Sequence, residues 1–238
     1  PFSTFGGLDP YRELCADLVE QYKPDNPSQA LVDSEMAAAG YEKDSDGFWA
    51  KDGARLTPEF QCACWLGPMG PVLEKQLRDA GFDVTVKLVT NTCDPFFERV
   101  RTGEADMWII VHCGSSREPW GTLQHYHSKF NSPEQGQTNN YVWANSQYNN
   151  PDYDALIDKL DGIPPSPDNP EYTDLVRQCV DIYLRDVIEI TMSEERHVRT
   201  YNYHYWTGWP NADDPYVAPY ALWAGIMLAL LKVEPTGA

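Results

Sequence analysis

The sequence predicts an α/β fold in which a mostly parallel sheet carries helices on both faces. Segments with strand and helix patterns alternate from residue 57 to residue 113, in the order strand, helix, strand, helix, strand. Strands connected through helices pair in parallel, because the helix carries the chain back across the sheet. The composition is that of a folded chain. Of its 238 residues 42% are apolar, including 8 Trp and 14 Tyr, which suffices for one large or two modest domains.

Two helices and a hairpin are predicted ahead of the sheet. The first helix begins at Asp9-Pro10, since Asp caps a helix and Pro suits its first turn. Its inward face consists of Tyr11, Leu14, Cys15, Leu18 and Tyr22. The second helix is expected from Ser28 to Ala39, with Gly40 ending it. The stretch "KDSDGFWAKDGARLT" contains two Asp-Gly turn signals, so we expect a surface hairpin there.

The elements of the sheet follow in order. "TPEFQCACW" is a strand candidate, and "MGPVLEKQLRDAG" is a helix that stops at Gly81. "FDVTVKLV" alternates apolar and polar residues, as a half-buried strand does. "CDPFFERVRTG" is a short helix with Asp94 as its cap and Gly103 as its end. "ADMWIIVHC" is almost continuously apolar, which is typical of a strand covered on both faces.

A polar, turn-rich stretch after Cys113 precedes two further helices. One begins at Pro151, and the other runs from Glu171 to about Val187. The inward positions of the first are Tyr153, Leu156, Ile157 and Leu160. "IEITMS" and "HVRTYNYHY" have the composition of strands. They lead into "YWTGWPNADDPY", residues 205–216, whose prolines and glycine predict an aromatic loop.

Charge and hydropathy exclude two classes of partner or location. The formal net charge of −18 repels a phosphate backbone, so we expect no nucleic-acid partner. The longest apolar run, "GIMLALL", is far shorter than the roughly 20 residues of a membrane helix. The chain starts without Met, and no signal peptide is visible. We interpret it as a fragment or mature segment, so the lack of a signal peptide does not indicate a cytoplasmic protein.

The six cysteines permit disulfides, because their number is even. An oxidising compartment or a thermophilic source would favour such bonds. Six cysteines allow 15 complete pairings, so spacing alone does not determine the connectivity. Buried free thiols are the alternative, since free Cys is among the most buried residue types. The cysteines are Cys15, Cys62, Cys64, Cys93, Cys113 and Cys179.

Aromatic residues gather in the predicted loops, where ligands of open α/β sheets bind beyond the carboxyl ends of the strands. One strand end runs into "WLGPMG" and another into "GSSREPW". Flat aromatic faces stack on sugar rings, peptide groups and apolar side chains. Any single Trp could instead anchor its loop on the core, but the set as a whole predicts a binding cleft. The tryptophans in or beside loops are Trp65, Trp120, Trp143, Trp206 and Trp209.

Metal binding has weaker support. "DSDG" resembles the start of a calcium loop, but the twelfth position from Asp44 is Arg55 rather than Glu, which excludes an EF-hand. "HYH" places His125 and His127 on one side of a strand, if a strand forms there. A zinc site is an alternative without the usual Cys-x-x-Cys spacing. Its ligands would be Cys62, Cys64, His112 and Cys113.

A hydrolase is the other alternative function. Ser115 and Ser116 follow a predicted strand, but "GSSREPW" lacks the Gly-x-Ser-x-Gly nucleophile elbow. Glu194-Glu195 and Asp213-Asp214 are paired acids. Adjacent residues on one strand point in opposite directions, whereas a glycosidase needs two carboxyl groups that face each other. We therefore interpret both acidic pairs as solvated charges.

Several stretches resemble one family in the same order along the chain. They are "MAAAGYEKDSDGFWAKDGARLT", "VLEKQLRDAGFDVTVKLV", "FFERVRTGEADMWI" and "NPDYDALIDKL". The family is the extracytoplasmic solute-binding proteins of ABC transporters, family 5, the peptide/oligosaccharide/nickel class. "YWTGWPNADDPYVAP" most resembles the branch that includes cello-oligosaccharide-binding receptors. The resemblance covers nearly the whole chain and implies a periplasmic-binding-protein-like (type II) lobe.

The resemblance also implies a domain organisation and a set of partners. Receptors of this family have two lobes around a cleft that closes on its ligand. Residues 1–204 match the second, C-terminal lobe, and residues 205–238 match a ligand-side loop and a segment that returns to the first lobe. That first, N-terminal lobe would be the missing partner of this C-terminal fragment. The expected function is a binding protein without enzymatic activity or cofactor, serving a membrane permease outside the cytoplasm.

The expected ligand is an oligosaccharide or an oligopeptide, in a cleft lined by aromatic residues. Peptide receptors resembling this chain carry an Asp that neutralises the ligand's α-amino group, in a loop ending in Glu-Pro. Aligning on Glu118-Pro119 places Ser115 near that position, which favours a sugar slightly over a peptide. The expected ligand contacts are Trp65, Ser115, Arg117, Glu118, Trp120, Trp206 and Trp209.

Overall fold

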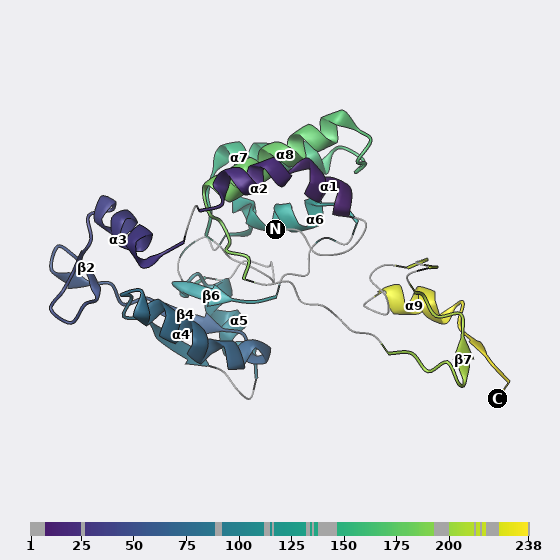
Figure 1. Ribbon diagram of the computed structural model, residues 1–238. Helices are drawn as coiled ribbons and strands as arrows, with labels where there is room; N and C mark the ends of the chain where they lie inside the picture. The colour runs from purple at the N-terminus through teal and green to yellow at the C-terminus, as the bar shows by residue number, and fades with distance from the viewer. Residues whose placement is uncertain are drawn as a thin grey trace. The chain divides into compact units, whose positions relative to one another are not determined.

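The structure, a computed structural model, divides into two compact units. Figure 1 shows its helices and strands. Unit 1 comprises Pro1–Gln21, Cys113–Gln124 and Ala155–Ala238, and unit 2 comprises Tyr22–His112 and His125–Asp154. The structure describes residues 8–24, 27–88, 92–111, 115, 117–131, 134, 136–137, 147–192, 200–211, 213–214, 216–217 and 224–237.

A three-stranded parallel sheet lies at the centre of unit 2, in the order β5-β4-β6. Its strands are β4 (Glu59–Cys62), β5 (Thr85–Leu88) and β6 (Met107–Ile109). Gln61 of β4 lies opposite Lys87 of β5 on one side and Trp108 of β6 on the other. The predicted alternation of strands and helices is therefore confirmed, with β4 as the middle strand.

Each face of this sheet is covered by one helix. Successive residues of a strand point to opposite faces, and the two hydrophobic clusters follow that rule. Phe60 and Cys62 pack with Leu73 of α4 (Gly70–Asp79). Ala63 packs with two buried residues of α5 (Asp94–Arg101) on the other face, namely Phe96 and Val100. The prediction of helices on both faces is confirmed. The predicted cap of α5 is one residue late, because Cys93 is the N-cap and Asp94 the first helical residue.

The predicted hairpin is a three-stranded antiparallel sheet, β1 (Glu42–Lys43), β2 (Trp49–Lys51) and β3 (Ala54–Arg55). The helix before it, α3 (Gln29–Ala38), is capped by Ser28, whose hydroxyl accepts the Leu31 N–H at 3.3 Å. Trp49 anchors the hairpin, because its indole N–H donates to the Ala80 carbonyl at 2.9 Å.

Arg55 holds the calcium-loop-like turn together without a metal. Its guanidinium donates to Asp44 at 2.6 Å, Asp46 at 2.5 Å and Asp83 at 3.2 Å. The Phe48 ring contacts two guanidinium groups: its centroid lies 5.0 Å from the Cζ atom of Arg55 and 4.9 Å from that of Arg78. The fixed cation of Arg55 therefore sits among these aspartates, where an EF-hand would supply Glu as an anionic ligand.

Unit 1 contains two short N-terminal helices and a long helix. They are α1 (Asp9–Leu14), α2 (Ala16–Tyr22) and α8 (Pro170–Arg185). The Tyr11 and Tyr172 rings meet edge to face at 6.0 Å. Arg177 of α8 donates to the Leu14 carbonyl at 2.7 Å and forms an ion pair with Asp17. These contacts hold the N-terminal helices against α8.

The helix α7 (Pro151–Asp161) contributes residues to both units. Its predicted inward face is confirmed, since all four residues predicted for it are buried. They are Tyr153, Leu156, Ile157 and Leu160. The remaining helical pieces are short. They are the α-helices α6 (Trp120–Leu123) and α9 (Ala224–Leu230), and the 3-10 turns η2 (Cys64–Met69), η3 (Gln124–Tyr126) and η4 (Ser128–Phe130).

The strands predicted for "IEITMS" and "HVRTYNYHY" are wrong wherever the structure describes them. Residues 188–192 and 200–205 form no strand, and Ile190 and Met192 are largely exposed. A strand needs a neighbour for its backbone hydrogen bonds. Of these residues Tyr205, which directly precedes β7, accepts the Thr236 N–H at 2.9 Å through its carbonyl. The next strand is β7 (Trp206–Thr207), which pairs antiparallel with β8 (Glu234–Pro235). No helix in the described part of the chain has the length and apolarity to cross a membrane.

Candidate ligand-binding site

Trp65 lies at the carboxyl edge of the parallel sheet in unit 2. β4 ends at Cys62, and η2 begins two residues later at Cys64, which forms a disulfide with Cys93. The Trp65 side chain is 45% exposed, and its ring centroid lies 6.1 Å from that of Phe97. An exposed indole beside the strand ends of a parallel sheet is placed where ligands of open α/β sheets bind.

Ser115 and Thr122 form a reciprocal pair in unit 1. The Thr122 N–H donates to the Ser115 hydroxyl at 2.8 Å, and the Ser115 N–H donates to the Thr122 hydroxyl at 3.1 Å. Both residues are buried, with Ser115 only 5% exposed. This pair closes the segment from 115 to 122 into a compact loop that ends in α6.

Glu118 ties the same loop to α8. Its carboxylate accepts the Gly121 N–H at 3.3 Å through one oxygen and the Tyr172 hydroxyl at 3.1 Å through the other. Burial raises the pKa of Tyr172 well above its ordinary value, and the negative charge of Glu118 raises it further. Tyr172 therefore stays a hydrogen-bond donor at any physiological pH, and it holds Glu118 in place.

Trp120 and Arg117 leave donor groups of this loop unused. Trp120 is the first residue of α6, and its indole N–H is buried without a partner in the described part of the chain. Arg117 is exposed and forms no ion pair with any residue that the structure describes. Buried polar groups are normally hydrogen-bonded, so the indole of Trp120 is a donor that an acceptor from outside could satisfy.

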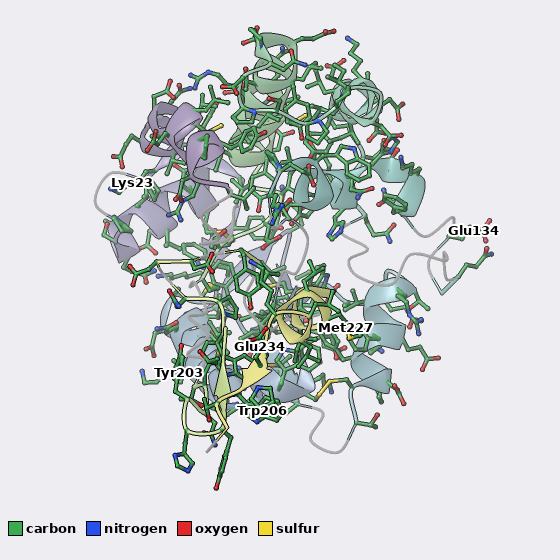
Figure 2. The ribbon with its side chains drawn as sticks, turned by 90° about the vertical axis from the view of Figure 1, so that its right-hand side faces the viewer. Lys23, Glu134, Tyr203, Trp206, Met227 and Glu234 are labelled. Carbon is green, nitrogen blue, oxygen red and sulfur yellow. A yellow bond between two sulfur atoms is a disulfide. The ribbon has the colours of Figure 1, made fainter. Side chains whose placement is uncertain are left out.

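The C-terminal aromatic residues divide into exposed and packed ones. Trp206 is 43% exposed, whereas Trp209 stacks on Tyr201 with centroids 4.9 Å apart and ring planes at 15°. Tyr203 and Tyr205 are more than half exposed, and sequence reasoning missed both as candidates. Figure 2 shows Tyr203 and Trp206 among the side chains of this segment. The aromatic composition of "YNYHYW" was the available signal, but a loop has no periodicity that tells an exposed ring from a packed one.

The loop around Gly208 is fixed by its backbone. Gly208 has a φ of +80°, and an added Cβ would lie 2.3 Å from the Lys232 carbonyl oxygen. Its own carbonyl accepts the Tyr216 hydroxyl at 2.7 Å. The Lys232 ammonium lies 4.1 Å from the centroid of the Tyr216 ring. Two separate chain segments therefore meet closely at Gly208, which places Trp206 and Thr207 in register with β8.

The structure brings only part of the predicted site together. Ser115, Glu118 and Trp120 share one hydrogen-bonded loop of unit 1, while Trp65 belongs to unit 2. The predictions that lie outside the described residues are those for His112, Cys113, Ser116, Trp143 and the pair Glu194-Glu195.

The geometry gives little support to the hydrolase alternative. Ser115 exchanges its hydrogen bonds with Thr122 alone among the described residues. Asp213 and Asp214 are exposed, and their N–H groups donate to the Asn211 side chain, which agrees with solvated charges. Neither group resembles a nucleophile next to its base or a facing carboxylate pair.

The proposed metal ligands are likewise not assembled in the described residues. Cys64 is bonded to Cys93 and offers no thiolate. His125 lies in the 3-10 turn η3 rather than on a strand, so the condition under which His125 and His127 would face the same side is not met. The His127 Nδ1 accepts the Lys129 N–H at 3.0 Å. In the part of the chain that the structure describes, no three His, Cys, Asp or Glu side chains are grouped to hold a metal ion.

Comparison with solved structures identifies the fold. The chain superposes on a periplasmic oligopeptide-binding protein of an ABC transporter from Thermotoga maritima, crystallised with mannohexaose bound, with a TM-score of 0.71 and 18% identity. That match covers 96% of this chain and 42% of the other. No family profile matches the sequence, and no curated protein aligns with it.

Two further structures of this group match less of the chain. NikZ from Campylobacter jejuni, in complex with Ni(L-His), gives a TM-score of 0.55 at 16% identity and covers 76% of this chain and 38% of its own. The oligopeptide-binding protein AppA of Bacillus subtilis, in complex with a nonapeptide, gives 0.51 at 17% identity with the same coverage of each chain. The fold is that of family 5 solute-binding proteins, as the sequence resemblance implied, and the chain spans well under half the length of these structures.

Proposed function

We propose that this chain is the ligand-binding C-terminal part of an ABC-transporter solute receptor that takes up an oligosaccharide or an oligopeptide. The observation that carries the proposal is the match of 96% of the chain to a receptor whose crystal structure holds mannohexaose. Exposed aromatic side chains agree with it, because aromatic faces stack well on sugar rings. The proposal assigns the protein a binding role without catalysis.

The proposed contacts fall into two groups by exposure. Trp65 and Trp206 offer exposed faces and are assigned direct stacking on the ligand. Trp120 is assigned a hydrogen bond to a ligand oxygen, since its indole N–H is buried without a partner among the described residues. Arg117, which is exposed, is assigned the polar contact.

The other predicted contacts have supporting roles in this proposal. Glu118 and Ser115 keep the loop of Trp120 in place through Tyr172 and Thr122. Trp209 stacks on Tyr201 and so steadies the segment that carries Trp206. A neutral Ser115 offers no charge for the α-amino group of a peptide, which favours the sugar over the peptide.

The organisation of the receptor follows from the same proposal. Residues 1–204 would form the second lobe, and residues 205–238 would carry a ligand-side loop and return to the first lobe. The exposed apolar residues of the C-terminal helix α9 would be covered by that first lobe; they are Ile226, Met227, Leu228 and Leu230. The receptor would act outside the cytoplasm and deliver its ligand to a membrane permease.

Tryptophan fluorescence tests the binding role directly. The chain is titrated with mannohexaose, a cello-oligosaccharide and a nonapeptide, each up to about 10 mM, where even a Kd in the millimolar range gives a measurable signal. We expect a saturable change with the oligosaccharides and a weaker one with the peptide. If no probe changes the fluorescence or is bound in calorimetry, the proposed function is wrong.

Two variants separate direct contacts from general effects. Replacing Trp65 or Trp206 with Ala should weaken binding by about 2- to 10-fold, which corresponds to the roughly 0.5–1.5 kcal/mol of one aromatic contact. Val72→Ala is the control, because Val72 is an exposed apolar residue on α4 with no assigned role. Equal losses in the Val72 variant would contradict the assignment.

A further inference from the structure

The disulfide of unit 2 joins the ends of two neighbouring strands of the parallel sheet. Cys64 comes two residues after β4, and Cys93 precedes α5 in the connection that leaves β5. β4 and β5 run parallel and pair directly, so their carboxyl ends lie at the same edge of the sheet. The disulfide therefore lies at the edge where Trp65 is exposed.

Trp65 and the disulfide belong to a closed ring of contacts. The Cys64 N–H donates to the Cys93 sulfur at 3.2 Å, and the Cys93 carbonyl accepts the Phe97 N–H at 3.1 Å. The Phe97 ring then contacts the Trp65 ring, with centroids 6.1 Å apart. The path runs from Trp65 through its neighbour Cys64, across the S–S bond to Cys93, along the first turn of α5 to Phe97, and back to Trp65.

The ring adds a covalent restraint to the packing of η2, whose Leu66 and Met69 contact the hydrophobic clusters of unit 2. Trp65 is nearly half exposed, and the short 3-10 turn that carries it contains Gly67 and Pro68 and buries none of its residues. Without the S–S bond, η2 and α5 would be connected through the sheet, through the Phe97 contact, and through Leu66 of η2, which packs with the cluster of Phe96 and Val100. The disulfide thus limits how far Trp65 moves relative to α5.

The accessibility of this cysteine pair sets it apart from the other described cysteines. Cys15, Cys62 and Cys179 are free and at most 1% exposed. Burial raises the pKa of Cys15 to about 11 and that of Cys179 to about 12, so both thiols stay protonated and unreactive. Cys64 and Cys93 are only partly buried. Among the described cysteines, Cys64 and Cys93 are therefore the ones that a reductant in solution reaches most easily.

We propose that the Cys64–Cys93 disulfide is the positioning element for Trp65, and that the site binds its ligand tightly only in the oxidised form. The inference rests on the proposed function in assigning Trp65 to ligand contact. The positioning role itself follows from the ring of contacts and does not depend on the identity of the ligand. Cys64 and Cys93 are positioning residues here, since they act on the ligand through Trp65.

The reducing agent that would open the site is a dithiol. One of its thiolates attacks a sulfur of the pair, the Cys64–Cys93 bond breaks, and a mixed disulfide forms. The second thiol of the reagent then displaces the remaining cysteine. Two electrons and two protons pass to Cys64 and Cys93, and the dithiol leaves as a cyclic disulfide. The products are two thiols at the edge of the sheet and an indole without its covalent restraint.

Collisional quenching measures the restraint on Trp65 without any ligand. Acrylamide quenching is recorded for the oxidised chain, for the chain reduced with dithiothreitol, and for a Cys64→Ser/Cys93→Ser variant. The same three measurements on a Trp65→Phe background isolate the contribution of Trp65 by difference. We expect that contribution to become more accessible to acrylamide in the reduced chain and in the double variant, and dithiothreitol to have no further effect on the double variant.

Titration with mannohexaose measures the effect of the disulfide on ligand affinity. Loss of the disulfide should weaken binding by about 2- to 10-fold, as far as loss of the Trp65 contact itself does. It should have no effect on the affinity of the Trp65→Ala variant, which lacks the aromatic ring. Circular dichroism at the titration temperature checks that the reduced chain and the double variant remain folded.

The outcomes distinguish this inference from a purely structural disulfide. If the melting temperature falls but the accessibility of Trp65 and the affinity stay unchanged, the disulfide only stabilises the fold and the inference is wrong. An equal loss of affinity in the Trp65→Ala background would also overturn it. If no probe binds either form, the proposed function fails, and the quenching comparison still decides whether the disulfide positions Trp65.

Discussion

Among single residues, Asp17 has a pKa that an ion pair lowers. Its hydrogen-bonded pair with Arg177 lowers the pKa of the carboxyl from 3.8 to about 2. A carboxylate with a lowered pKa in the folded state stabilises that state above its unfolded pKa. This contribution is lost as the pH falls from about 4 to about 2, and it is small because the side chain of Asp17 is exposed.

Asp17→Asn should therefore make the free energy of unfolding depend less on pH between about 7 and 2.5. Urea unfolding at pH 7, 4 and 2.5 would show the variant less stable than the parent at pH 7 and close to it at pH 2.5. Asp174→Asn is the control, since Asp174 is an exposed carboxylate on the same helix as Arg177. A difference between Asp17→Asn and the parent that stays constant with pH would contradict the ion-pair explanation.

At the residue scale, the chemical role of a side chain was easier to predict from the sequence than whether that side chain is exposed or packed. Arg55 shows the successful case, because a cation at the twelfth position of a calcium-like loop excludes the metal wherever the side chain points. Trp209 shows the limit. It was predicted as a ligand contact, and its stack on Tyr201 is a tertiary contact between loop residues that no sequence period encodes.

Among elements, the pair β7–β8 depends on one glycine. Gly208 follows β7 directly, has a positive φ and leaves no room for a Cβ beside Lys232. A left-handed backbone alone costs a non-glycine residue about 1–2 kcal/mol. Gly237 has nearly the same φ, +79°, but nothing lies within 4 Å of its added Cβ.

Gly208→Ala should consequently open the β7–β8 pair, whereas Gly237→Ala should only weaken it. Limited proteolysis followed by mass spectrometry measures cleavage between residues 200 and 237. We expect cleavage at least about 10-fold faster for Gly208→Ala than for Gly237→Ala, which corresponds to about 1.4 kcal/mol of additional opening. Equal rates in the two variants would show that backbone strain, and not the contact with Lys232, governs the element.

The helices and the parallel sheet were predictable because each carries its own period and its own stop signals. Leu73 and Leu77 of α4 pack on the sheet as their spacing predicted, and Gly81 ends that segment with a φ of +96°. The strand predicted for "IEITMS" was wrong for a different reason. Its β-branched composition favours an extended backbone, but a strand exists only where a second chain segment supplies hydrogen bonds.

On the scale of the whole molecule, an apolar C-terminal segment contrasts with a strongly acidic chain. The exposed apolar residues of this segment, which includes α9, are Ile226, Met227, Leu228, Leu230 and Leu231. Figure 2 labels Met227 on this helix. Contiguous exposed apolar residues favour association, while the formal net charge of −18 opposes it by repulsion.

Self-association should therefore increase with salt. Raising the ionic strength from about 0.01 M to about 0.1 M shortens the screening length from about 30 Å to about 10 Å. Sedimentation velocity should show more dimer or larger species at the higher salt, and Met227→Gln/Leu231→Gln should remove them. Val72→Gln/Val187→Gln, which changes two exposed apolar residues elsewhere, should not. Association that persists in the first variant would assign it to another surface.

The resemblance of several short stretches, in their order along the chain, anticipated the fold that the solved structures share at 18% identity. How the parts of a site come together was not predictable in the same way. Trp65 and Trp120 belong to different packed units, and no local pattern determines how two such units approach each other.

The topology of unit 2 also predicts the order in which its strand contacts form during folding. The strands β1, β2 and β3 follow one another along the chain and pair with their neighbours, so each contact closes a short loop. The parallel strands meet only after a whole helix has crossed between them, and contacts between distant residues form slowly. During refolding, the β1–β2–β3 pairing therefore forms early. Trp49 of β2 becomes buried only when Ala80 at the end of α4 arrives beside it, and Trp108 of β6 becomes buried late.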